Sequence, residues 1–223
     1  MDMTPLWISL QVAVPAAAIT FIAGLVAAWA VSYCGKAKHV VDSIFTIPLV
    51  LPPTVVGFLL LIVFGTNSTI GGALLKVGIR LIFTKTGAVI AASVVSFPVM
   101  YRGARGALDQ VDRNLVYAAR SLGMNEFTIL LRILLPCAWP GIAASAILSF
   151  ARALGEFGAT IMVAGNIPGK TQTMSIAVYT AMQSGNREKA YTWVIITVLF
   201  SLMILIAMNI LTDRGTRRLR RGT

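Results

Sequence analysis

Arg152 and Glu156 are side chains of opposite charge, four residues apart in an otherwise apolar stretch. At this spacing they lie one turn apart on the same face of a helix. Charges inside a membrane span are costly, so they usually face the interior of a helix bundle in pairs. Two interpretations stay open: Arg152 lines or gates a path for an anion, or the two groups pair and hold helices together. We favour the second. Gly155 and Gly158 beside them permit close approach of helices.

Residues with the chemistry of catalysis are few in this sequence. An intramembrane enzyme requires a nucleophile with a base, or a set of metal ligands, at membrane depth. The single His39 lies in a predicted loop, and Arg152 and Glu156 have no nucleophile beside them. Cys34 and Cys137 lack the spacing of metal ligands and are expected to be free thiols. We therefore predict no catalytic residue, no metal site and no cofactor bound by this chain.

The segment from Gly165 to Thr171 is similar to a phosphate-binding loop, but its spacing is wrong. Such a loop has four residues between its first glycine and the Gly-Lys-Thr triplet. Here three residues intervene, and Ala164 stands where that glycine is required. We expect a turn around Pro168 and Gly169 instead.

The composition predicts the elements that position these residues. Of the 223 residues, 57% are hydrophobic and only 12% are charged, whereas soluble domains carry about 25% charged residues. We therefore predict an integral membrane protein with one transmembrane domain over residues 1–223. The net charge of +11 would suggest nucleic-acid binding in a soluble protein. Here the basic residues lie in loops and the tail, so membrane orientation explains them and no nucleic acid is expected.

Five apolar segments are long enough to cross a membrane as helices, which takes about 20 residues. The predicted spans are Leu6 to Val31, Ile44 to Phe64, Gly87 to about Tyr101 with an extension toward Leu108, Ala138 to Val163, and Tyr191 to Leu211. Residues 165–189 are predicted as a polar loop. Residues 65–85 are predicted as a loop with an apolar hairpin-like piece, either re-entrant or forming a sixth crossing. Pro48, Pro52 and Pro53 must interrupt the second span, and such breaks occur where neighbours or a watery cavity satisfy the freed carbonyls. Pro52 and Pro53 are therefore candidates for a translocation path, as is the charged pair.

The distribution of basic residues predicts how the chain is oriented. Segments 34–41, 101–136 and 213–223 hold twelve Lys and Arg residues, whereas segments 65–85 and 164–190 hold six. The positive-inside rule therefore places the N-terminus outside and the C-terminus in the cytoplasm. The arginines of the tail are expected to anchor to anionic lipid.

Residues 117–136 form a long stretch on the predicted cytoplasmic side, with apolar segments on both flanks. Gly123 can take the left-handed conformation that closes a helix, and Asn125 is a suitable N-cap for a second helix. Pro136 fits the first turn of the element that follows. The stretch is therefore predicted to be two short helices that meet at a bend, with the first ending at Leu122.

This stretch resembles the cytoplasmic signature of permease subunits of binding-protein-dependent ABC importers. The residues in register with that signature are Ala118, Ala119, Gly123, Ile133, Leu135 and Pro136. Tyr117 departs from it, because the family usually has Glu there. The resemblance implies that a loop of about residues 108–136 docks in a groove of a separate ATPase subunit, which uses ATP and Mg²⁺. The implied coupling residues are Tyr117, Ala118, Ala119, Arg120, Gly123, Met124, Phe127 and Pro136.

Two further stretches resemble the oxyanion importers of that family, which carry molybdate, tungstate or sulfate. Residues 150–173 and 47–57 look most like the molybdate group. The resemblance implies an all-α permease of the type I ABC importer fold in a bacterial or archaeal inner membrane. Its implied partners are a second copy of the chain, two ATPase subunits and an extracytoplasmic molybdate-binding protein. The implied receptor contacts are Asn166, Pro168, Gly169 and Lys170. Import of sulfate or tungstate is the alternative, and a passive anion channel is a more remote one.

Overall fold

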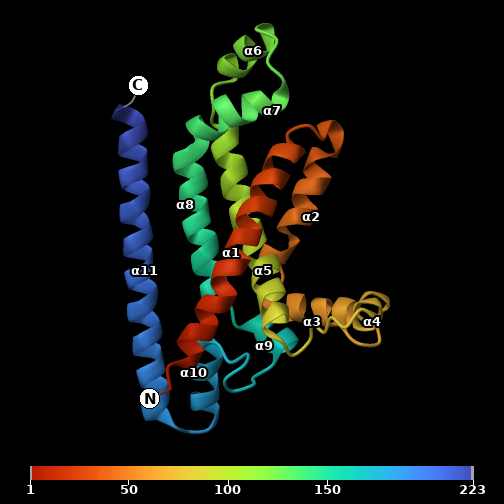
Figure 1. The fold of residues 1–223 in the computed structure, drawn as a ribbon, viewed down its shortest axis with the longest axis vertical. Helices are drawn as coiled ribbons and strands as arrows, with labels where there is room; N and C mark the ends of the chain where they lie inside the picture. The colour runs from red at the N-terminus through yellow and green to blue at the C-terminus, as the bar shows by residue number, and fades with distance from the viewer. Residues whose placement is uncertain (1, 222–223) are drawn as a thin grey trace.

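The chain folds into a series of helices of very different lengths (Figure 1). The structure is a computed structural model that describes residues 2–221, with side chains described for residues 2–210. In chain order the helices are α1 (Thr4–Val31), α2 (Lys38–Val50), α3 (Pro53–Phe64), α4 (Thr69–Lys76), α5 (Lys85–Asp109), α6 (Arg113–Ser121), α7 (Glu126–Ile129), α8 (Leu135–Leu154), α9 (Gly158–Ala164), α10 (Met174–Gln183) and α11 (Arg187–Arg221). Two short turns complete the series, a 3-10 turn η1 (Gly35–Ala37) before α2 and a π-helical turn η2 (Leu130–Leu134) before α8.

Four stretches of helix are long and apolar enough to cross a membrane: α1, α5, the run Glu126–Leu154 that ends in α8, and α11 over Arg187–Ile210. Helices α2 and α3 add a fifth crossing if the bent pair counts as one span. The start of α1 and the end of α11 lie at opposite ends of the bundle (Figure 1), as an odd number of crossings requires. The predicted all-α membrane class with five spans is therefore confirmed. Helix α4 has eight residues and is too short for a sixth crossing.

The centre of the bundle is the packing of α1 against α5. Small side chains line it, and Ala16, Ala88 and Ala92 are fully buried in one cluster. Gly24 lies so close to α5 that a Cβ added there would be 2.8 Å from Met100 Cγ. Small residues at such contacts are typical of membrane helices, which gain stability from close packing. Helix α8 packs on α1 and α5 and completes this core.

The predicted break in the second span is present, because α2 and α3 are bent by 110°, whereas Pro48 lies inside α2 and does not interrupt it. Leu51 has extended backbone at the break, with ψ 141°, and α3 starts directly after Pro52. Proline lacks the N–H that would continue the helix. Helix α3 turns aside and packs on α9, where a Cβ added at Gly57 would be 2.8 Å from the Cα of Ala159.

Both predicted loops between spans contain a helix that we did not predict. Residues 65–85 hold α4, whose N-cap Ser68 accepts a hydrogen bond from Gly71 N at 2.8 Å. Residues 165–189 hold α10, whose first amide, at Met174, donates to Ser9 Oγ of α1 at 2.8 Å. This contact with α1 comes from the tertiary fold and leaves no local signal in the sequence.

The fourth predicted span also differs from the structure at both ends. Helix α8 ends at Leu154, and a break separates it from the short α9, so the span does not reach Val163. At the other end, α7 runs through η2 into α8 without stopping. Pro136 lies in the first turn of α8, as predicted. Its ring would clash with the carbonyl of Arg132 in a regular α-helix, and the wider π-helical turn relieves this conflict.

Candidate functional site

The predicted bend is present at one end of the bundle, between α6 and α7 (Figure 1). The second helix is not a separate short one, as predicted, because α7 continues into α8. Asp112 caps α6 by accepting a hydrogen bond from Asn114 N at 2.9 Å. Gly123 has a φ of 77°, which is the left-handed conformation expected of it. Asn125 caps α7 through a hydrogen bond from Thr128 N at 2.8 Å. Local sequence signals therefore determine the shape of this loop.

A polar cluster that we did not predict ties the loop to α1. Arg120 donates to Glu126 through Nε at 2.7 Å and through Nη2 at 3.1 Å. Tyr33, two residues beyond the end of α1, donates its hydroxyl to Glu126 Oε2 at 2.7 Å. The hydrogen bond to Glu126 raises the pKa of the Arg120 guanidinium, which therefore stays charged. Partial burial, together with the bond to Glu126, raises the pKa of the Tyr33 hydroxyl, which therefore stays a donor.

Glu126 is the functional candidate that the sequence analysis missed. It directly follows the N-cap Asn125, and an acidic residue in the first turn of a helix is a recognisable signal. Its contact with Tyr33 joins positions 93 residues apart. No spacing rule brings such positions together.

The tip of the loop presents apolar side chains to its surroundings. Tyr117 is 55% exposed, Leu122 81% and Phe127 60%. Ala119 is only 3% exposed and packs inside the loop, so its side chain does not offer a contact surface. Large apolar side chains that are exposed on a projecting loop point to an interaction site. The other predicted coupling residues Ala118, Arg120, Gly123 and Pro136 are exposed, and Met124 is half-buried.

Arg152 and Glu156 form the predicted ion pair, with Arg152 Nη1 2.7 Å from Glu156 Oε2. Glu156 does not lie in the middle of a span, however, because it stands in the break between α8 and α9. Its side chain is 1% exposed, and its other oxygen accepts a hydrogen bond from Ala159 N at 2.7 Å. Glu156 therefore joins the end of α8 to the start of α9 and has partners for both oxygens.

The structure brings the predicted proline break close to this charged pair. A Cβ added at Gly158 would lie 2.9 Å from Pro53 Cβ, and Glu156 precedes Gly158 by two residues. Pro52 directly precedes α3 at the same junction. The four candidate path residues thus belong to two breaks that meet where α3 packs on α9.

The four predicted receptor contacts lie on an exposed turn at the end of the bundle opposite α6 (Figure 1). Asn166 donates to Thr180 Oγ1 and accepts from Gln172 Nε2, both at 2.9 Å. Gly169 has a φ of 75° and closes the turn. Pro168 and Lys170 are exposed beside it. Helix α9 precedes this turn, whereas a phosphate-binding loop follows a strand.

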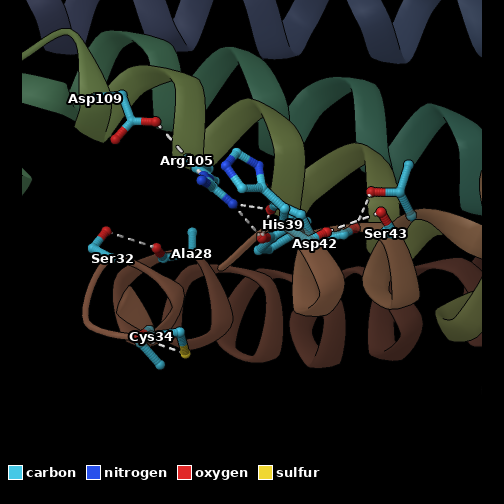
Figure 2. A network of polar contacts seen from close by, with 11 residues as sticks. Ala28, Ser32, Cys34, His39, Asp42, Ser43, Arg105 and Asp109 are labelled. Atoms are coloured by element: carbon cyan, nitrogen blue, oxygen red, sulfur yellow. Dashed lines mark hydrogen bonds and ion pairs between the residues drawn. The ribbon is translucent and has the colours of Figure 1, made fainter. Parts of the chain in front are cut away.

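A second polar feature lies between α2 and α5, toward the end of the bundle that carries α6. It is a hollow of about 790 Å³. Inside it, Arg105 of α5 forms an ion pair with Asp42 of α2 (Figure 2). None of its residues was predicted as a site, because it is formed by residues about sixty positions apart.

A bundle of membrane-spanning helices with a capped, apolar loop projecting from one end matches the membrane subunit of a transport system that the sequence predicts. The chain belongs to the family of binding-protein-dependent transport system inner membrane components, whose model matches residues 20–223. It is therefore a multi-pass inner membrane protein and a non-catalytic subunit.

Relatives and solved structures agree with this family. The molybdenum transport system permease protein ModB of Escherichia coli (strain K12) is 43% identical over 202 residues, covering 89% of this chain and 88% of ModB. The "Probable sulfate transport system permease protein cysT" of Chlorella vulgaris is 31% identical over 211 residues, covering 93% of this chain and 79% of cysT. An inward facing structure of the MetNI methionine ABC transporter matches with a TM-score of 0.73 and 21% identity, covering 96% of this chain and 94% of that one. The predicted permease fold is therefore confirmed.

Proposed function

We propose that this chain is the permease subunit of an ATP-driven importer of molybdate. The observation that carries the proposal is the 43% identity to the molybdenum permease of Escherichia coli, against 31% to the sulfate protein of Chlorella vulgaris. The resemblance of residues 47–57 and 150–173 to the molybdate group supports the same substrate. Sulfate and tungstate remain the alternatives, since these anions share the tetrahedral shape and charge of molybdate.

The proposed assembly has two copies of this chain, two ATPase subunits and an extracytoplasmic molybdate-binding protein. The ATPase subunits hydrolyse ATP with Mg²⁺, and this chain binds neither. The count of basic residues supports an N-terminus outside and a C-terminus in the cytoplasm. In that orientation the exposed tip formed by Tyr117, Leu122 and Phe127 faces the ATPase, and Asn166, Pro168, Gly169 and Lys170 face the receptor. The arginines of the tail, Arg214 to Arg221, are proposed to contact anionic lipid, and their side chains lie outside the described residues.

Force from the ATPase has two routes from the loop into the bundle. One is covalent, since α7 continues through η2 into α8. The other is the Glu126–Tyr33 hydrogen bond, which joins the loop to the end of α1. Because α1 and α8 both pack on α5, a push on the loop reaches all three central helices. This arrangement suits a subunit that converts a cytoplasmic push into alternating access.

The proposal is tested by uptake into proteoliposomes that contain this chain with its ATPase, supplied with the receptor protein. Accumulation of molybdate that needs ATP supports it. A passive channel would admit molybdate without the ATPase. Sulfate that competes as well as molybdate for the receptor protein would overturn the choice of substrate.

A further inference from the structure

The hollow between α2 and α5 follows α2 along its whole length. On α2 it is lined by His39, Asp42, Ser43, Thr46, Ile47 and Val50, and it reaches Leu51 at the break before α3. On α5 it is lined by the last turns, from Tyr101 to Asp109. It therefore extends from the proline break toward the end of the bundle that carries α6 and α7 (Figure 1). A volume of about 790 Å³ accommodates a hydrated small anion.

Arg105 is the central polar group of this hollow. Its side chain is only 12% exposed and forms an ion pair with Asp42. Its Nη1 donates to Tyr101 Oη at 2.8 Å, and its Nε lies 3.6 Å from Asp109 Oδ2. Figure 2 shows the guanidinium of Arg105 lying between the two carboxylates, with His39 beside it. This largely buried guanidinium thus has two acceptors for Nη1 and a second carboxylate near Nε.

The charges of the hollow are closely balanced. Arg102 and Arg105 face it with Asp42 and Asp109, and His39 also lines it. Arg102 is exposed and forms no ion pair with the described residues. An anion that enters the hollow therefore meets one free guanidinium and one that is already neutralised.

A guanidinium binds a carboxylate and a tetrahedral oxyanion with the same planar set of donors. An oxyanion can therefore replace Asp42 on Arg105 and keep this buried guanidinium paired, since leaving it unpaired would be costly. The displaced carboxylate of Asp42 is 31% exposed and keeps the Tyr101 hydroxyl as a donor. The carboxylates of Asp42 and Asp109 stay nearby and repel the bound anion, so it is held weakly and leaves readily. Phe45 of α2 packs edge-on against Tyr101 and Phe97 of α5, with ring centroids 5.3 and 5.5 Å apart. These contacts hold α2 in place while the ion pair is open.

We propose that this hollow is a transient binding site for a tetrahedral oxyanion, in which Arg105 exchanges Asp42 for the ligand and Arg102 adds a second contact. The proposal rests on the proposed function, since it assigns a binding site for the transported anion on the cytoplasmic half of the translocation path. A phosphate group of an anionic lipid has the same chemistry. We commit to the soluble anion, because the hollow leads to the proline break inside the bundle.

The test is equilibrium dialysis of molybdate against the full chain in nanodiscs of zwitterionic lipid. Asp42→Asn removes the competing charge from Arg105, so it is expected to bind molybdate about tenfold tighter than the wild type, equivalent to ~1.4 kcal/mol. Adding Arg105→Gln to this variant is expected to abolish the gain. Asp112→Asn is the matched control, because it neutralises a carboxylate outside the hollow while asparagine preserves the cap of α6.

If Asp42→Asn does not fold, Asp109→Asn is tested in its place. It removes the other carboxylate beside Arg105 and spares the contact between α2 and α5. It is expected to tighten binding less than Asp42→Asn. Unchanged binding in the folded carboxylate variants overturns the site. Loss of the gain when anionic lipid replaces zwitterionic lipid assigns the hollow to lipid phosphate and also overturns it.

This dialysis needs no ATPase and no transport, so it is independent of the uptake test. If wild-type proteoliposomes import molybdate but the folded carboxylate variants bind it no tighter, only the site is wrong. If wild-type proteoliposomes import sulfate instead of molybdate, the proposed substrate is wrong. The site then stands if Asp42→Asn tightens the binding of sulfate.

Discussion

Tyr33 and Glu126 are joined by a 2.7 Å hydrogen bond across 93 positions of the sequence. Tyr33 stands just beyond α1, and Glu126 is the first residue of α7. The bond therefore links the loop that is proposed to receive the ATPase with a helix at the centre of the bundle.

We predict that Tyr33→Phe uncouples ATP hydrolysis from transport. Phenylalanine keeps the ring and removes the donor, so the loop can move without pulling α1. Molybdate transported per ATP hydrolysed is expected to fall several-fold, while the melting temperature stays within about 2 °C of the wild type. Parallel uptake and phosphate-release assays measure this ratio. Tyr191→Phe, at another exposed tyrosine near the start of α11, is the control. A normal ratio in Tyr33→Phe would show that α1 receives no force by this route.

The bend at Gly123 is expected to tolerate only residues that accept a positive φ. Its φ is 77°, whereas proline is fixed near −65°. Gly123→Pro should abolish transport and capture of the ATPase while the protein remains in the membrane. Gly123→Asn is the matched control, because asparagine enters the left-handed region more readily than other residues with side chains. Membrane fractionation and co-purification provide the readout. Normal ATPase yield and normal uptake with Gly123→Pro would refute the role of the bend.

Phe127 is expected to be an anchor for the ATPase. It is 60% exposed at the tip of the loop, and a buried aromatic anchor contributes about 2 kcal/mol or more to an interface. Phe127→Ala should therefore weaken binding of the ATPase by more than tenfold. Titration of the purified subunits measures this change. Val77→Ala, also at an exposed position but just beyond α4, should leave the affinity unaltered. Equal affinity of both variants would place the contact elsewhere on the chain.

Arg152→Ala is expected to disturb folding at least as much as anion selectivity. It leaves the carboxylate of Glu156, which is 1% exposed, without its counter-charge. Removing one partner of a buried ion pair costs about 3–5 kcal/mol. The double variant Arg152→Met with Glu156→Gln should regain most of this stability, because the amide oxygen can still accept from Ala159 N. Thermal unfolding in detergent measures both. A stable single mutant with an altered anion preference would favour the gate interpretation.

The sequence predicted the features that depend on neighbouring residues. Gly123 and Asn125 carry local signals for a turn and a cap, and the structure has both. Pro52 and Pro53 predicted a break in the second span. The 110° change of direction depends on the packing of α3 against α9, which no local pattern specifies.

The contacts that make the candidate sites were not predictable in the same way. Asp42 and Arg105 are 63 positions apart, and they meet only because α2 folds back along α5. Glu156 was correctly paired with Arg152 from helical spacing. Its second role, as the acceptor for Ala159 N at the start of α9, became visible only once the break after α8 was known.

ATP-driven uptake tests the central claim most directly. Proteoliposomes with this chain, its ATPase and the receptor protein are given labelled molybdate with and without ATP. We predict accumulation only with ATP and only with the ATPase present, with little inhibition by an excess of sulfate. Equal inhibition by sulfate, or entry of molybdate without the ATPase, would contradict the account.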